Sequence, residues 1–283
     1  MMKYWINQLK SKILVSAILL TLPIQNFAFA QANKNQESVS IKPNTNQIEE
    51  AKLVEAPKNA EQQKGKLWSF LHPYQANYSG FYGKDKVGRA NRELSFKDEK
   101  WQLETYAKLS KLFFKIKSKE FSKFAIDENK LVTHQFYSST KRTFKDEKKM
   151  EQHFDWENKL ETGYQGKNKW ETPLNDLVYD RVSHLIQLRA NFLSNNPSLS
   201  FEVSYKGEIK NYQYELEKSE TIKTKMGDLK SEKLVRTKSN GDQFVVWLSP
   251  ELNYLPIKIA QYEKDKSDVV MLLDNINYVS ETH

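Results

Sequence analysis

Arg189 is the side chain with the clearest potential for chemistry, because it interrupts the apolar face of a helical segment. When residues 180–193 are placed 100° apart, as in a helix, the apolar side chains gather on one side. That side holds Val182, Leu185, Ile186, Leu188, Phe192 and Leu193, and the opposite side holds Ser183, His184, Gln187 and Asn191. Arg189 projects from the middle of the apolar side. A guanidinium stays charged in a protein interior, and burying it without a partner costs several kcal/mol.

Three environments are open to Arg189. Its stem can lie on apolar surface while its head reaches water. It can pair with a carboxylate such as Asp180, or with one on a facing strand. It can also anchor an otherwise apolar cavity by binding the carboxylate or phosphate of a ligand. The last environment makes Arg189, Leu185, Val182, Phe192 and Trp247 the expected ligand-binding residues.

Patterns typical of catalysis or metal binding are absent from the sequence. The five histidines form no His-Glu-x-x-His motif, and His153 with Asp155 supplies only two ligands. There is no Gly-x-Ser-x-Gly motif and no phosphate-binding loop. Ser138 and Lys141 match a Ser-x-x-Lys pattern, but its companion motifs are missing. We therefore expect no enzyme, no cofactor and no metal, and the sequence places no two carboxylates together as an acid–base pair.

The first 30 residues have the features of a cleaved signal peptide. Lys3, Lys10 and Lys12 precede an apolar stretch of about 12 residues, and Ala28-Phe29-Ala30 is a small-x-small cleavage site. Cleavage after Ala32 is an alternative, and an uncleaved anchor is the rival interpretation. The apolar stretch is shorter than the roughly 20 residues that span a bilayer, which favours cleavage.

The expected export of the protein determines the compartment and the partners that we expect for it. The chain has no cysteine, which excludes a lipid-anchored lipoprotein and disulfides. Residues 31–66 lack aromatic residues and are rich in Asn, Gln, Lys and Glu, as in a flexible tether. Three of the eight net positive charges lie in residues 1–30, so about +5 remains. We expect a soluble periplasmic protein that does not span the membrane after cleavage and does not bind nucleic acid.

A single domain, residues 67–283, is expected to be mainly β. Alternating apolar and polar residues predict strands throughout it. The predicted strands are 74–78, 89–96, 101–109, 131–138, 201–206, 209–216, 228–237, 244–248, 255–262 and 269–278. Residues 142–169 are polar and predict two or three exposed strands or a flap. The helix is expected to begin at an Asp180 N-cap and to stop before Pro197.

Residues 108–123 are the most charged of the predicted strand regions. Lys111, Lys115, Lys117 and Lys119 share one parity, and Leu112, Phe114 and Ile116 share the other. This spacing predicts an apolar row on the core and a lysine row in water. The lysines can be a solvated face, can protect an edge strand from aggregation, or can bind an anionic partner such as lipid headgroups or an acidic polymer.

Residues 244–248 and 269–273 are apolar on both faces, so each needs a cover on each side. The segment 180–193 is the only element that the sequence offers to cover the inner face.

Four stretches in order resemble the DUF3108 family of exported bacterial domains of unknown function. They are Tyr74-x-Ala76-x-Tyr78, Asp180-x-Val182-Ser183-x-x-x-Gln187-Leu188-Arg189, Thr224-x-x-Gly227-x-Leu229-x-x-x-Lys233-Leu234-x-Arg236, and Trp247-Leu248-Ser249 followed by Pro256-Ile257-Lys258-Ile259. The resemblance covers about residues 74–278. It implies a curved antiparallel sheet, or half-open β-barrel, with one main helix packed on its concave face, similar to periplasmic lipoprotein carriers. It implies no activity.

These observations lead to three hypotheses. The first is a periplasmic binding or carrier module for an apolar or amphipathic, lipid-like ligand. The second is a non-enzymatic scaffold or adaptor that contacts another protein of the cell envelope. The third is an enzyme, which would need convergent carboxylates in a pocket.

Overall fold

The computed structural model describes residues 67–175, 177–194, 198–263 and 268–279. The expected signal peptide (1–30) and tether (31–66) lie outside these described residues. Within the described ranges, no helix has the length and apolar character needed to cross a membrane.

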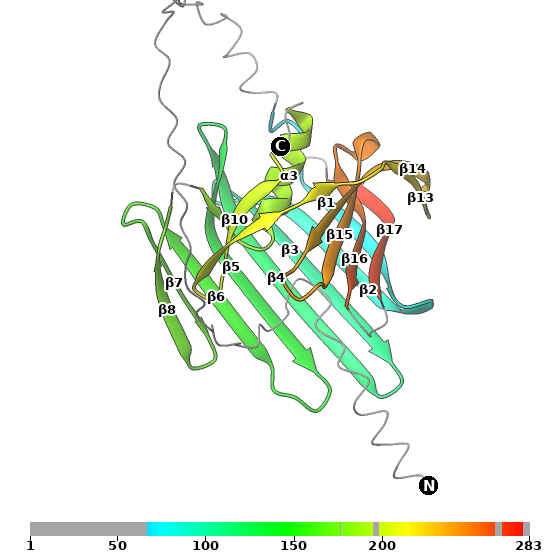
Figure 1. The fold of residues 1–283 in the computed structure, drawn as a ribbon, viewed down its shortest axis with the longest axis horizontal. Coiled ribbons are helices and arrows are strands. Elements are labelled where there is room, and N and C mark those ends of the chain that lie inside the picture. Colours follow the sequence, from blue (N-terminus) through cyan, green and yellow to red (C-terminus); the bar gives the residue numbers. More distant parts are fainter. Residues whose placement is uncertain (1–66, 176, 195–197, 264–267, 280–283) are drawn as a thin grey trace, which may run out of the picture.

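One large antiparallel sheet dominates the fold (Figure 1). Its strands are β1 (Tyr74–Tyr82), β2 (Asp85–Lys97), β3 (Lys100–Lys111), β4 (Phe114–Asp127), β5 (Lys130–Arg142), β6 (Lys148–Asp155), β7 (Leu160–Gln165), β8 (Asn168–Pro173), β12 (Glu215–Leu216), β13 (Glu220–Thr224), β14 (Gly227–Thr237), β15 (Gln243–Ser249), β16 (Leu255–Tyr262) and β17 (Val269–Tyr278). A short 3-10 helix, η1 (Pro250–Leu252), joins β15 to β16. The strand order is β12-β14-β15-β16-β17-β1-β2-β3-β4-β5-β6-β7-β8, with β13 beside β14. The end strands β12 and β8 do not pair, so the sheet curves without closing into a barrel.

Irregularities in β1 and β2 lie where the sheet turns from one arm (β14–β17) to the other (β2–β8). The register of β1 shifts against β17 at Asn77/Tyr78 and against β2 at Gly80/Phe81. Such bulges bend a strand and increase its twist. Gly88 supports the bend, because a Cβ there would lie 2.0 Å from the backbone oxygen of Lys108.

The lysine-rich region differs from its prediction at one point. Residues 108–123 form the end of β3 and the start of β4, with Leu112 and Phe113 in the turn between them. Ile116 is buried and Lys115 and Lys117 are exposed, as the alternation predicts. Leu112 does not join the apolar row: it is 70% exposed, because the turn takes it out of the pleat.

The 142–169 region extends the sheet through β6 and β7, and β8 follows. This outcome agrees with the prediction of two or three strands. Met150 and Phe154 of β6 face the core and are buried. Gly163 of β7 leaves space for the Trp170 ring, since a Cβ on Gly163 would lie 2.5 Å from it.

The helix α3 (Ser183–Leu193) packs in the concavity between the large sheet and a second sheet. The second sheet consists of β9 (Val178–Tyr179), β10 (Ser200–Tyr205) and β11 (Glu208–Gln213), and β9 pairs parallel to β10. Part of the polar side of the helix is therefore covered as well: Ser183 and His184 are both fully buried. The His184 ring packs at 6.0 Å from Phe201 of β10 and 5.4 Å from Tyr212 of β11.

The helix begins later than its predicted N-cap. The capping position is Val182 rather than Asp180. Asp180 still binds the first turn, because its Oδ1 accepts hydrogen bonds from the backbone N–H groups of Val182 (2.6 Å) and Ser183 (2.9 Å). The carboxylate thus satisfies helix donors from outside the helix.

Both faces of β15 and β17 are covered, as their composition requires. The helix α3 and the opposite arm of the sheet cover the inner face. The β13–β14 hairpin folds across the outer face, where β13 contacts β16 and β17. Ile222 and Leu229 of this hairpin are buried there.

Candidate functional site

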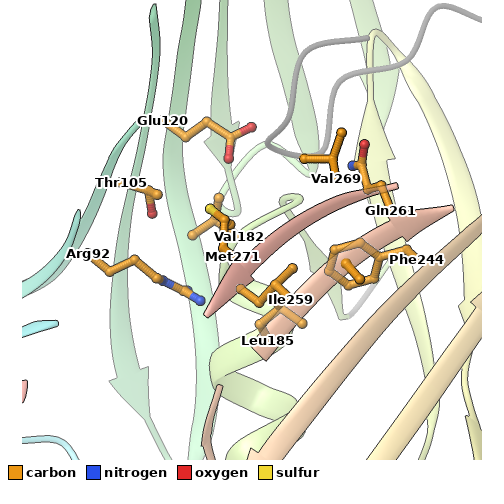
Figure 2. Close-up of a pocket in the computed structure, with 11 residues that line it drawn as sticks. Arg92, Thr105, Glu120, Val182, Leu185, Phe244, Ile259, Gln261, Val269 and Met271 are labelled. Atoms are coloured by element: carbon orange, nitrogen blue, oxygen red, sulfur yellow. The ribbon is translucent and has the colours of Figure 1, made fainter. Parts of the chain in front are cut away.

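A small cavity lies between α3 and the two arms of the curved sheet (Figure 2). It is lined by Arg92, Thr105, Glu120, Val182, Leu185, Phe244, Ile259, Ala260, Gln261, Val269 and Met271. Its volume is about 20 Å³, enough for roughly one water molecule. Most of the wall is apolar, and the polar groups come from β2, β3, β4 and β16.

The polar groups of the cavity form a row across three neighbouring strands. Arg92 of β2 is paired with Thr105 of β3, and Thr105 is paired with Glu120 of β4. Directly paired residues project from the same face of a sheet, so all three side chains point inward. Figure 2 shows the Arg92 and Glu120 side chains directed toward the space that Met271 and Ile259 border.

The polar row keeps hydrogen-bonding capacity that the protein does not use. Arg92 Nε, Glu120 Oε1 and Gln261 Oε1 are buried and have no hydrogen-bond partner among the described residues. The same holds for Ser118 Oγ, which lies two residues before Glu120 on the same face of β4. Each such group costs about 1–3 kcal/mol. A polar molecule that reached these atoms would recover part of that cost.

Glu120 has an unusual protonation equilibrium. Burial raises its pKa from 4.5 to about 7, and the negative charge of Asp180 acts in the same direction. The positive charges of Arg181 and Arg92 oppose this effect without cancelling it. At neutral pH the carboxyl group can therefore both donate and accept a proton, which is the property of a general acid or base.

The second buried carboxylate, Asp180, has a structural role. Its Oδ2 accepts a hydrogen bond of 2.5 Å from Ser122 of β4, and its Oδ1 caps α3 as described above. Ser183 and Thr133 are joined by a further hydroxyl contact of 3.0 Å. Burial raises the pKa of Asp180 to about 6, although these hydrogen bonds favour its charged form. Asp180 thus attaches the start of α3 to the sheet and does not line the cavity.

His184 is held neutral on the other side of α3. Its Nε2 lies 2.9 Å from the Tyr214 hydroxyl, and its ring packs against aromatic side chains of the second sheet. Burial lowers its pKa to about 3, and the positive charge of Arg236 contributes. No group of three or more metal-ligating side chains is found among the residues that the structure describes.

Arg189 lies at the far end of α3 from the cavity. It is 2% exposed, which excludes the snorkelling environment. Its guanidinium stacks 4.5 Å above the centre of the Phe70 ring, and its Nε donates a 3.2 Å hydrogen bond to the backbone oxygen of Asn253. Within the described part of the chain it forms no ion pair with a carboxylate. Burial lowers the pKa of Arg189, and nearby tyrosines oppose that shift.

The five residues predicted to bind a ligand are not brought together. Val182 and Leu185 line the cavity. Phe192 packs 5.0 Å from Tyr254, at the same end of α3 as Arg189. Trp247 faces the outer side of β15, where its Nε1 donates to Glu220 of β13 and Lys258 lies 4.0 Å above its ring.

The sequence interpretation missed Arg92, Thr105, Glu120 and Gln261. A signal was present, because Arg92 has the inward parity of Ala90 and Leu94. Glu120 likewise has the inward parity of Ile116 and Phe124. The Ser138–Lys141 pattern does not form a site, because Ser138 faces the interior and Lys141 is exposed.

Comparisons with known proteins identify the fold but no activity. The model of the family described as "Protein of unknown function (DUF3108)" matches residues 74–274. The crystal structure of a beta-barrel-like protein of domain of unknown function DUF1849 from Brucella abortus superposes with a TM-score of 0.51. It shares 11% sequence identity, and the match covers 74% of this chain and 99% of that chain. At this identity the likeness shows the fold alone.

A second solved structure, from Parabacteroides distasonis and described as a candidate lipoprotein, has a TM-score of 0.30 and 12% identity. That match covers 73% of this chain and 95% of the other, but its TM-score is too low to support an argument. No curated protein sequence matches the chain.

Proposed function

The chain belongs to the DUF3108 family, and from the geometry of its interior we propose that it is a non-enzymatic binding module for a small amphipathic ligand. The observation that carries the proposal is the convergence of unpartnered polar atoms from Arg92, Glu120 and Gln261 on one cavity with apolar walls. Ligand sites typically combine apolar walls with a few oriented polar groups.

The polar groups define the head of the ligand. Arg92 supplies a donor with a positive charge, and Glu120, with a pKa of about 7, can donate or accept a proton. A carboxylate or phosphate head would bind Arg92 and share a proton with Glu120. The apolar part would contact Leu185, Met271 and Val269.

The small size of the cavity means that the protein must change shape to bind such a ligand. A volume of about 20 Å³ does not hold an alkyl chain, so the two arms of the sheet must separate for binding. The sheet is open at β8 and β12, and the bends at Gly80 and Gly88 lie between the arms. A small change in the curvature of β1 and β2 would widen the cavity without breaking a pairing between strands.

Binding can be tested with dodecanoate as the probe and isothermal titration calorimetry as the measurement. Val269→Phe places an aromatic ring in the cavity. Its matched control is Val270→Phe, because Val270 is the next residue of β17 and faces the other side of the sheet. We expect Val269→Phe to weaken dodecanoate binding by about tenfold or more, as loss of a buried contact area predicts, and Val270→Phe to leave binding near that of the unmodified protein.

Native mass spectrometry and lipid extraction of the protein from its own host provide an independent measurement. A co-purified amphipathic molecule that is absent from the Val269→Phe protein would support the proposal. Bare protein, together with equal dodecanoate affinity in the two valine variants, would contradict it.

A scaffold or adaptor role is the second candidate, and the filled core favours it. At the far end of α3, Arg189 stacks on Phe70 and Phe192 packs on Tyr254, so buried side chains occupy the described part of that end. A protein that carried no ligand but retained an envelope partner after mild cross-linking would agree with this second candidate.

We also propose that the protein is exported to the periplasm and released as a soluble chain. The positively charged N-terminal region, the short apolar stretch and the cleavage site within residues 1–30 support this proposal. N-terminal sequencing of the exported protein should begin near Gln31 or Asn33. A sequence that began at Met1 would contradict the proposal.

A further inference from the structure

One end of the large sheet carries exposed apolar side chains among lysines. This end, here called the basic hairpin edge, consists of the turns 83–84, 112–113, 143–147 and 166–167 together with the strand ends beside them. Figure 1 shows the corresponding hairpins of β1–β2, β3–β4, β5–β6 and β7–β8 projecting from the same end of the sheet. None of these turns contributes to the cavity.

Three large apolar side chains project from the two central hairpins of this edge. Leu112 is 70% exposed, Phe113 is 77% exposed and Phe144 is 90% exposed. The two hairpins are in contact, because the Thr143 N–H donates to the Lys115 backbone oxygen (3.0 Å) and the Lys115 N–H donates to Thr143 Oγ1 (2.7 Å). The apolar residues therefore lie at the tips of adjacent, mutually supported loops.

The requirements of the turns do not explain these residues. Leu112 has a φ of 52° and Phe144 a φ of 60°, a left-handed conformation that Gly, Asn and Asp adopt more readily. Two-residue hairpins usually contain Asn-Gly or Asp-Gly. The opposite end of the same sheet shows ordinary polar choices, with Asp98-Glu99 and Glu128-Asn129 in the equivalent turns.

Positive charge surrounds the apolar tips. Exposed lysines in or beside every turn of the edge have no ion pair with a carboxylate in the part of the chain described; they include Lys84, Lys115, Lys117, Lys141, Lys145, Lys148 and Lys167. Lys111 is paired with Asp85 and Lys149 with Glu147, and Asp146 is the remaining acid of the loop. The opposite turns carry Asp98, Glu99, Asp127 and Glu128 next to Lys97, Lys100 and Lys130, so their charges nearly cancel and that end has no comparable excess of lysine. The sheet is therefore electrically polarised along its strands, with the apolar tips at the positive end.

We infer that the basic hairpin edge docks on the surface of an anionic lipid membrane, with Leu112, Phe113 and Phe144 inserted among the headgroups. A membrane surface supplies both features that this edge requires, since its phosphates attract lysines and its acyl boundary accepts apolar side chains. A soluble polyanion would satisfy only the lysines. This inference concerns the outside of the sheet and does not depend on a ligand in the cavity.

Co-sedimentation of the full chain with vesicles tests the inference. The protein should bind vesicles of phosphatidylglycerol mixed with phosphatidylcholine, and binding to phosphatidylcholine alone should be at least about tenfold weaker. Added salt should weaken binding, because it screens the lysines. Replacing Lys115 and Lys117 by glutamine together should reduce the preference for phosphatidylglycerol.

The double variant Phe113→Ser with Phe144→Ser separates membrane insertion from charge attraction. It should lose about tenfold or more of its affinity for the anionic vesicles. The matched control is Phe96→Ser, because Phe96 is 51% exposed but lies beside the Asp98-Glu99 turn at the opposite end of the sheet. The control should bind as the unmodified protein does, and thermal melting should confirm that all variants are folded.

A fluorescent label reports insertion directly. The chain contains no cysteine, so Phe113→Cys gives a single attachment point for an environment-sensitive dye, and Phe96→Cys gives the control. The emission of the dye at position 113 should shift to the blue on addition of anionic vesicles, and the emission at position 96 should not.

Several outcomes would overturn the inference. Equal binding of the Phe113/Phe144 double variant and the unmodified protein would show that the tips do not insert. Equally tight binding to soluble polyphosphate in both proteins would identify a polyanion as the partner. A dimer in solution that the same double variant converts to monomer, without vesicle binding, would identify a second copy of the chain as the occupant of the tips.

Discussion

Replacing Glu120 by glutamine should change how the stability of the protein depends on pH. In the folded protein the pKa of Glu120 is raised from 4.5 to about 7, mainly by burial. A raised carboxyl pKa means that the folded state holds its proton more tightly than the unfolded state. The contribution of the Glu120 carboxyl group to the free energy of unfolding is therefore favourable below the pKa of the unfolded state. It is lost as pH rises from about 4.5 to about 7. Glutamine has a similar shape and does not ionise, so the variant does not lose this stability as pH rises.

The size of the effect follows from the pKa shift. One pKa unit corresponds to about 1.36 kcal/mol, so a shift from 4.5 to about 7 corresponds to about 3 kcal/mol once both states have ionised. Most of this change falls between about pH 5 and pH 8. Relative to the unmodified protein, Glu120→Gln should gain about 2–3 kcal/mol of unfolding free energy over that interval.

The assay is urea unfolding of both proteins at each pH. His184 has the opposite pH dependence, because its lowered pKa makes the folded state less stable in acid. That contribution is present in both proteins and cancels in the difference. Glu104→Gln is the control. Glu104 lies on the outer face of β3 in an exposed ion pair with Lys119, so its replacement should change the free energy of unfolding little at any pH of the series. A difference between Glu120→Gln and the unmodified protein that stays constant from pH 5 to pH 8 would refute the assignment of a raised pKa to Glu120.

Three further results are expected. Leu185→Ala should lower the free energy of unfolding by about 2–5 kcal/mol in urea unfolding, because Leu185 is 2% exposed between α3 and the sheet; a loss below about 1 kcal/mol would contradict its place in the core. Arg189→Met should be neutral or stabilising within about 1 kcal/mol, because it removes a buried charge that has no carboxylate partner among the described residues. The hydrogen bond to Asn253 is lost, but Asn253 is exposed and its oxygen can bind water instead. A loss of stability above about 2 kcal/mol in a thermal melt would show that the stacking on Phe70 outweighs the cost of burying the charge. The His184 ring should remain neutral down to about pH 4 in an NMR titration, because its pKa is lowered to about 3; a transition near 6.5 would mean that the ring is accessible to water.

Local periodicity predicted most elements of the fold, but it missed β9 and β13 and joined β11 to β12 as one strand. Alternation in 101–109 and 131–138 predicts β3 and β5, because strand side chains alternate between two faces whatever their partner is. The spacing of Val182, Leu185 and Phe192 predicts α3 for the corresponding helical reason. The family likeness implied one curved antiparallel sheet, and the structure has such a sheet, although β9, β10 and β11 form a second one.

The same reasoning failed where an element is covered from two sides. His184 and Ser183 lie on the polar side of the predicted helix, but His184 packs on the second sheet and Ser183 contacts Thr133 of β5, and both are buried. Their polar atoms are satisfied locally, by the Tyr214 hydroxyl and by Thr133, so burial carries little penalty. Nothing in the helix sequence indicates that β10 and β11 leave the large sheet and pack on this side.

The candidate site depended most on tertiary structure. The inward parity of Arg92 and Glu120 can be read from each strand alone, but their meeting depends on the register of three strands. That register follows from the two-residue turns 98–99 and 112–113, and a slip of one residue would turn each side chain to the opposite face. The sequence alone therefore determined most of the segments that form strands and the segment that forms the helix, because those preferences are local. Only the tertiary structure decided that Arg92, Thr105 and Glu120 share one cavity and that Arg189 lies outside it, because contacts between distant strands depend on the packing of the whole sheet.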